Sequence, residues 1–258
     1  MLAIDRQGAV LHLRLDRAQR HNAFDDHLIG ALTQALEGAA GDNTLRAVVL
    51  SGNGRSFSAG ADLDWMARLA AASEADNVAD AQALARLMRT LDTLPVPTIA
   101  AVHGSVYGGG VGLVACCDIA IASEDARFAL SEVRLGLLPA VISPYVVAAI
   151  GPRQARRWFS TGQPFDAATA HAIGLVHEVV PGGQLQDAVA AQLALLAQAA
   201  PQACRGAKQL VASVLAATDA GELDLANARR IAHLRAGAEG REGLAAFLEK
   251  RPAIWTCA

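Results

Sequence analysis

The chain has 258 residues, of which 53% are hydrophobic and 18% charged, a composition typical of a folded globular protein and not of a fibre or a disordered chain. The formal net charge of −3 argues against the basic surface by which proteins hold nucleic-acid backbones. The first residues carry charge at once, and no run of about 18 uncharged apolar residues occurs that could cross a bilayer. We therefore expect a cytoplasmic protein with no nucleic-acid partner and no membrane partner.

The cysteines and histidines show no ligand spacing. Cys116, Cys117, Cys204 and Cys257 form no C-x-x-C pair, so we expect reduced core thiols. His103, His171 and His177 are isolated, and no metal site is expected from them.

The first half of the chain alternates apolar strands with helices. The patterns predict a strand over 9–15, a helix over 23–36, and further strands over 46–50, 98–103 and 118–122. This alternation is typical of an α/β fold with mostly parallel pairing.

The second half is predicted to be mainly helical. Helical periodicity covers 166–172, with Asp166 as the N-cap, and then 185–199, 202–215 and 223–236. We expect residues 1–199 to form a core that carries the site and residues 200–258 to form a helical region that packs on its own domain or on a neighbouring chain.

Three segments have the composition of a site. The first, Ser56–Asp62, follows a strand and precedes a helix, so its small residues let a ligand approach the main chain. An equally good interpretation is a tight turn in which Asp62 caps the helix.

The second segment, His103–Gly112, contains Gly110-Val111-Gly112-Leu113-Val114-Ala115, which matches the loose G-x-G-x-x-A pattern of dinucleotide binding. That pattern belongs to the first strand of a Rossmann unit, with an acidic residue about twenty positions on. Neither condition is met here, so nicotinamide binding is disfavoured.

The third segment, Ser131–Ala140, places Glu132 among apolar residues. Two interpretations stay open. Glu132 is either paired with Arg134 or another nearby cation, or it is held with a raised pKa for proton transfer.

Taken together, these segments resemble the enoyl-CoA hydratase/isomerase family, the crotonase superfamily. The matching motifs run in order along almost the whole chain: Arg20-His21-Asn22-Ala23-Phe24, Phe57-Ser58-Ala59-Gly60-Ala61-Asp62, Gly104 with Gly108-Gly109-Gly110, Cys117-Asp118, Ser131-Glu132 with Leu135-Gly136, and Phe247-Leu248-Glu249-Lys250-Arg251. The resemblance implies a spiral of β-β-α units with a C-terminal helical trimerisation region, assembled as a homotrimer or a dimer of trimers.

The resemblance also implies residue roles. The main-chain N–H groups of Ala59 and Gly109 are expected to form an oxyanion hole for a thioester carbonyl, and Glu132 matches one of the two carboxylates of family hydratases. The second carboxylate is replaced here by Gly112. Either Glu132 acts as both acid and base, or another group compensates, or the reaction needs one base only, as double-bond isomerisation does.

The longer stretch around Glu132, together with Ala59–Met66 and Gly112-Leu113, resembles bacterial hydratases of methylglutaconyl-CoA in leucine breakdown and of isohexenylglutaconyl-CoA in acyclic terpene breakdown. The preferred hypothesis is hydration of a branched, carboxylated 2-enoyl-CoA. The alternatives are an enoyl-CoA isomerase and a non-catalytic CoA-binding or RNA-binding member of the fold.

Coenzyme A is expected only as part of the substrate, with no permanently bound cofactor. The residues that the resemblance places at the substrate are Arg20 and Lys250 at the phosphates, Ala61, Asp62 and Leu63 at the adenine, Trp65, Met66 and Leu69 along the acyl channel, and Ala23, Gly112 and Pro139 in the matching motifs. Arg68, Arg86 and Arg89 are candidates for a distal substrate carboxylate, although a solvated helix charge is the more ordinary role for each.

Overall fold

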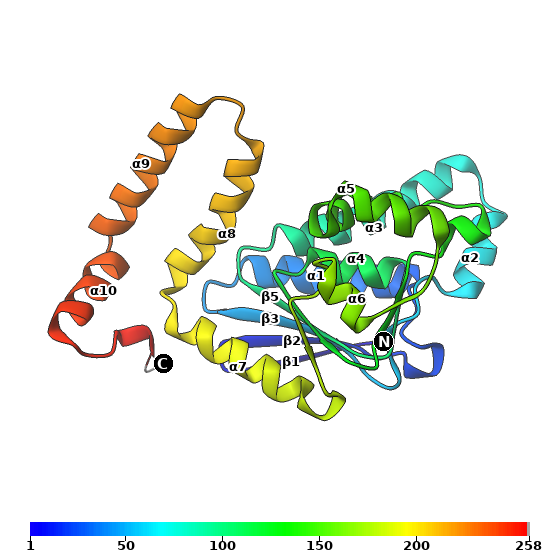
Figure 1. Cartoon of the computed structure of the whole chain (residues 1–258), viewed down its shortest axis with the longest axis horizontal. Coiled ribbons are helices and arrows are strands. Elements are labelled where there is room, and N and C mark those ends of the chain that lie inside the picture. The colour runs from blue at the N-terminus through cyan, green and yellow to red at the C-terminus, as the bar shows by residue number, and fades with distance from the viewer. Residues whose placement is uncertain (257–258) are drawn as a thin grey trace.

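Three successive strand–strand–helix units form the body of the protein (Figure 1). The computed structural model describes residues 1–256. The first unit contains β3 (Ala47–Gly52), β4 (Ser56–Ser58), α2 (Leu63–Ala70) and α3 (Glu74–Asp92); the second contains β5 (Thr98–Val102), β6 (Ser105–Tyr107) and α4 (Gly109–Cys116); the third contains β7 (Ile119–Ser123), β8 (Arg127–Ala129), the short 3₁₀ helix η2 (Glu132–Leu135) and α5 (Ser143–Thr161). The expected succession of β-β-α units is confirmed.

Each unit contributes its first strand to one sheet and its second strand to another. The larger sheet has the order β1-β2-β3-β5-β7-β10, and the smaller has the order β4-β6-β8-β9. Pairing is parallel from β2 (Val10–Leu15) through β10 (Glu178–Val180), whereas β1 (Leu2–Gln7) and the two-residue β9 (Phe165–Asp166) pair antiparallel at the edges. Because parallel strands end on the same side of a sheet, the turns that follow β4 and β6 come together.

The larger sheet is covered on both faces. Leu13 and Leu15 of β2 are fully buried in the main core, which also includes residues of α1 (Asp26–Ala40) and α3. Val49 and Ile99 lie in a second, smaller cluster with residues of α7 (Leu185–Gln198). Covering on both faces explains why β3 reads as a continuous apolar run.

The last three long helices form an arm. Figure 1 shows α8 (Pro201–Ala216), α9 (Ala220–Ala236) and α10 (Ala238–Glu249), drawn from yellow to red, projecting from the body, whose far end carries α2. Neither α8 nor α9 contains a fully buried residue. The division near residue 200 stays a prediction.

Most expected elements are present, with shifted ends. Helix α1 begins at Asp26 because the carboxylate of Asp25 accepts the N–H of Leu28 at 2.8 Å, which fixes the N-cap two residues later than the start expected from periodicity. The N-cap at Asp166 is confirmed by its bond to the N–H of Thr169, which opens α6 (Ala167–Ala172). Strand β1 was not predicted.

Cys116 and Cys117 are buried free thiols, and burial raises the pKa of Cys117 to about 12. Cys204 is half-buried and also free, whereas Cys257 lies outside the described residues. Within residues 1–256, none of the helices has the length and apolar character needed to cross a membrane.

Candidate active site

Two glycine-containing turns meet where β4 and β6 end. Gly60 follows β4 with φ of 86°, and Gly108 follows β6 with φ of 49°, a region that L side chains rarely adopt. A Cβ atom built on Gly60 would lie 3.1 Å from the carbonyl oxygen of Tyr107. The turns therefore touch along their backbones, and glycine permits that approach.

The carboxylate of Glu132 lies against the turn that follows β6. A Cβ atom on Gly108 would lie 3.2 Å from Oε1 of Glu132 and 3.9 Å from the Cα atom of Gly60. Glu132 opens η2, directly after β8 of the same small sheet. Three segments that are far apart in sequence thus meet at Gly108, which has the carboxylate of Glu132 and the bend at Gly60 as neighbours.

No ion pair neutralises Glu132 within the described residues. Its Oε2 atom is buried and has no hydrogen-bond partner within residues 1–256, and burial raises the pKa of this carboxyl. Arg134 is exposed and lies instead beside Gly162, where a Cβ atom would be 3.2 Å from Cγ of Arg134. Of the two open interpretations, the ion pair with Arg134 is wrong, and the raised pKa is the state found.

A buried carboxylate without a partner is unfavourable for folding, because burial disfavours its charged form. Groups of this kind, placed beside main-chain bends, are candidates for proton transfer. The geometry at Glu132 has that character.

The backbone donors of the two turns differ from the expected pair. The N–H of Ala59 donates to the carbonyl of His21 at 2.9 Å, so the expectation that Ala59 supplies a free donor is wrong. The Phe24 N–H donates to the Gly60 carbonyl at 2.7 Å, and the Asp62 N–H donates to the Phe24 carbonyl at 2.8 Å. In this parallel bridge the N–H of Ala61, the residue between them, points away from Phe24.

Ala61 and Gly109 are therefore the residues with available N–H groups. Ala61 is exposed, and its N–H has no backbone acceptor within the described chain. Gly109 is the first residue of α4, where N–H groups have no acceptor inside the helix. The chain thus offers at least one donor from each turn.

The place expected for a second carboxylate is filled. A Cβ atom on Gly112 would lie 2.3 Å from Cγ2 of Ile142 and 3.2 Å from Cε of Met88. Ile142 is 2% exposed. No side chain fits at position 112 without moving Ile142, so this position has no room for a second carboxylate.

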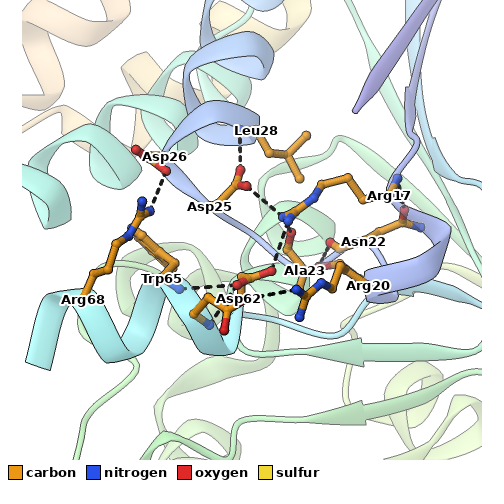
Figure 2. Close-up of polar contacts among 12 residues, drawn as sticks. Arg17, Arg20, Asn22, Ala23, Asp25, Asp26, Leu28, Asp62, Trp65 and Arg68 are labelled. Atoms are coloured by element: carbon orange, nitrogen blue, oxygen red, sulfur yellow. Dashed lines mark hydrogen bonds and ion pairs between the residues drawn. The ribbon is translucent and has the colours of Figure 1, made fainter.

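Arg17, which was not singled out from the sequence, holds the first turn in place. Its guanidinium contacts Oδ2 of Asp25 at 3.0 Å, Oδ2 of Asp62 at 3.1 Å and the carbonyl of Ala23 at 2.7 Å, as Figure 2 shows. The Arg17 side chain is only 12% exposed, and it joins the start of α1 to the start of α2. An arginine beside one acidic residue is common in sequences, so this network had no distinctive signal.

Asp62 is a helix cap, and its carboxylate is fully engaged. It accepts the N–H groups of Asp64 at 2.9 Å and Trp65 at 3.3 Å, as well as the bond from Arg17. Burial alone would raise the pKa of Asp62, but these two N–H groups and the guanidinium lower it below its usual value. The expected cap at Asp62 is confirmed, and its position at the adenine stays a prediction.

The other residues expected to contact the CoA moiety lie in two separate parts of the molecule. Arg20 bonds to Asp64 at 2.9 Å on the exposed rim of the first turn, where Leu63 is 76% exposed. Lys250 ends α10, at the opposite end of the molecule from α2 (Figure 1). One chain alone therefore does not bring Lys250 to the turns.

Of the expected acyl-channel residues, Trp65 is buried and Leu69, like Met66, is half-buried. Trp65 is 7% exposed, belongs to the main core, and donates through Nε1 to Asp80 of α3 at 3.1 Å. Ala23 and Pro139 are buried. Their roles at a substrate stay predictions.

Known proteins match the chain over nearly its full length. The sequence profile of the family described as enoyl-CoA hydratase/isomerase covers residues 5–257. The 2,3-dehydroadipyl-CoA hydratase of Escherichia coli is 35% identical over 259 residues, which span 97% of this chain and 96% of that protein.

Solved structures agree with that match. An enoyl-CoA hydratase from Shewanella pealeana superposes with a TM-score of 0.94 at 42% identity, covering 98% of this chain and 95% of its own. Pseudomonas aeruginosa AtuE superposes with a TM-score of 0.96 at 37% identity, covering 99% of each chain.

Proposed function

Because the chain belongs to the enoyl-CoA hydratase/isomerase family, we propose that it adds water to a 2-enoyl-CoA thioester, with Glu132 as its single acid–base group. The observation that carries this proposal is the position of the unpaired Glu132 carboxylate against Gly108, whose turn also packs against Gly60. A carboxylate beside two main-chain bends that touch each other can serve a reaction that polarises a carbonyl and moves a proton.

The N–H groups of Ala61 and Gly109 are proposed to bind the thioester oxygen. As the β-carbon is attacked, negative charge develops on this oxygen, and a preorganised donor that meets the charge is worth on the order of 10²–10³ in rate. The exposed N–H of Ala61 and the helix-start N–H of Gly109 have no competing acceptor within residues 1–256.

Glu132 is proposed to act as base and then as acid. Its carboxylate takes a proton from water as the oxygen of that water bonds to the β-carbon, and it then returns a proton to the α-carbon. The raised pKa suits the first step, since it makes the carboxylate a stronger base toward water. Ile142 fills the position where a second carboxylate would share the work.

The acyl group is proposed to be branched and carboxylated, of the 3-methylglutaconyl or isohexenylglutaconyl type. This rests on the likeness of the stretches around Glu132 and Gly112 to such hydratases and on the named substrate of the E. coli relative, 2,3-dehydroadipyl-CoA, since an adipyl chain ends in a carboxylate. Arg68 and Arg86 are engaged on the surface by Asp26 and Glu37. Of the three arginine candidates, only Arg89 has no ion pair within the described chain.

The assembly is proposed to be a homotrimer or a dimer of trimers. The arm leaves large apolar side chains uncovered: Leu215 and Phe247 are each 81% exposed, and Leu248 is 76% exposed. Further copies of the chain would cover them and would bring Lys250 of one chain toward another chain's turns. Light scattering on the eluted protein tests this assembly, and a monomer would contradict it.

The test of the activity is direct. The purified chain is mixed with 3-methylglutaconyl-CoA, with straight-chain crotonyl-CoA as the comparison, and loss of the conjugated-thioester absorbance is followed with mass analysis of the product. We expect addition of one water. An enoyl-CoA isomerase would instead move the double bond with no change in mass, and a non-catalytic CoA-binding protein would do neither.

A further inference from the structure

A polar cavity lies on the face of the larger sheet that α7 covers. It has a volume of about 290 Å³, well above the roughly 30 Å³ that one water molecule occupies in the liquid. Its walls come from β2, from the ends of β3 and β5, and from the start of α7. Alternation along β2 separates it from the main core, because Leu13 and Leu15 point to one face and His12 and Arg14 to the other.

The cavity is lined by donors and no acid. Its polar side chains are those of His12, Arg14, Ser51, Asn53, His103 and Gln186, and the described residues that line it include no Asp or Glu. Asn53 is already engaged with Asp16 at 2.8 Å, and Nε2 of His103 faces the carbonyl of Gly54 at 3.0 Å.

Arg14 is the decisive residue. It is half-buried, and within residues 1–256 its guanidinium has no hydrogen bond and no ion pair. The half-buried Arg205, by contrast, donates to the carbonyls of Asp42 and Leu45 at 2.9 Å each. Because a partly buried charge without an acceptor is unfavourable, Arg14 indicates a missing anionic partner.

The neighbours of Arg14 suit the same partner. Burial is the largest effect on His12 and lowers its pKa below the usual value. Asp5, which pairs with His12 across the two strands, raises this pKa, and Arg14 lowers it further. A neutral His12 ring still has one N–H to donate, and the Ser51 hydroxyl donates no hydrogen bond within the described chain. A planar guanidinium with these donors matches the oxygens of a small oxyanion.

We propose that this cavity binds a small oxyanion of the inorganic phosphate class, held by Arg14 with His12 and Ser51. The site is separate from the proposed active site, since Glu132 follows β8 of the smaller sheet. Its walls include the residues that end β3 and β5, the first strands of the two units whose second strands, β4 and β6, lead into the two turns.

The test uses inorganic phosphate and the full-length protein, titrated by calorimetry with coenzyme A present at saturation. The coenzyme occupies any phosphate contacts of the substrate site, so the remaining binding belongs elsewhere. We expect saturable binding with one site per chain, and Arg14→Gln should weaken it at least tenfold, in line with loss of a charged hydrogen bond. Arg156→Gln, which changes an exposed arginine that also has no ion pair in the described chain, should leave binding unchanged.

A second measurement does not depend on the folding of the Arg14 variant. In the unmodified protein, the ring signal of His12, assigned with His12→Gln, should shift with phosphate at the same midpoint as the calorimetric titration. Hydration activity within twofold of the unmodified enzyme shows that Arg14→Gln is folded. Equal phosphate binding by Arg14→Gln and the unmodified chain, loss of all phosphate binding under saturating coenzyme A, or an unmoved His12 signal would each overturn the proposal.

Discussion

The contact between Gly112 and Ile142 predicts how substitutions at these two positions change stability, and so tests whether Ile142 fills the place of a second carboxylate. In Gly112→Ala the new Cβ atom would lie 2.3 Å from Cγ2 of Ile142, whereas carbon atoms prefer separations of about 3.5–4.0 Å. One of the two groups must move by more than 1 Å, and overpacking of this kind typically costs about 1–3 kcal/mol. Ile142→Ala alone removes a buried side chain and should cost about 2–5 kcal/mol.

The two changes should compensate each other. Ile142→Ala removes the closest atom, so the double variant should be more stable than the sum of the single effects predicts, by about 1–2 kcal/mol. Gly30→Ala is the matched control, because a Cβ atom there meets nothing within 4 Å. It should be neutral or stabilising by up to about 1 kcal/mol.

The assay is urea-induced unfolding of the four proteins and the unmodified chain, followed by circular dichroism at one protein concentration. Additive effects of Gly112→Ala and Ile142→Ala, or a Gly112→Ala variant as stable as Gly30→Ala, would refute the view that Ile142 occupies the place of a second carboxylate.

Further predictions concern the charges and donors of the site. Glu132→Gln should be more stable than the unmodified protein at neutral pH, and the two should be equally stable below the ordinary Glu pKa of 4.5. The reason is that the pKa of Glu132 is higher in the folded state, so the unmodified protein loses stability as the pH rises through that folded-state pKa. Thermal unfolding across pH measures the difference in stability, and a difference that does not change with pH would contradict the prediction. Arg17→Ala should lower the free energy of unfolding by about 3–5 kcal/mol, because Asp25 and Asp62 would stay buried without their cationic partner. Arg17→Lys should restore part of this loss, and the unfolding midpoints of the two variants test the prediction. Replacing the Ala61 amide by an ester should lower kcat by about 10²–10³, and the same change at Ala59 should affect stability instead; similar kcat losses at both positions would argue against the assignment. Arg89→Gln should raise KM for carboxylated enoyl-CoA only, with Arg68→Gln as the control, and an equal rise for crotonyl-CoA would count against a carboxylate contact.

The parts of the fold that could be predicted from the sequence are those whose residue pattern lies within one short segment of the chain. The apolar runs of β3 and β5 and the Gly-rich segments after them were recognisable because each depends on nearby residues. Glu132 was recognisable as unusual, since an acid among apolar residues requires an explanation. Strand β1 was not recognisable, because its alternation is weak and its outer residues are exposed.

The parts that were not predictable depend on contacts over long sequence distances. Ala59 and Ala61 are the same residue type within one motif, so the sequence does not tell which of the two N–H groups is free. Only the structure shows that the N–H of Ala59 is bonded to the carbonyl of His21. The loss of space at Gly112 depends on Ile142, thirty positions later, and no local pattern encodes it. The network of Arg17 joins three segments whose spacing is set by the fold.

The central claim is that one carboxylate performs the whole addition of water. The measurement that tests it is turnover of 3-methylglutaconyl-CoA in ¹⁸O-labelled water by the unmodified chain and by Glu132→Gln, with acyl-CoA affinity determined for both. We predict a labelled hydroxyl product from the unmodified chain, a rate lower by about 10²–10⁴ in the variant, and affinities within about tenfold of each other. A variant that hydrates at the unmodified rate, or an unmodified chain whose product carries no label, would contradict the claim.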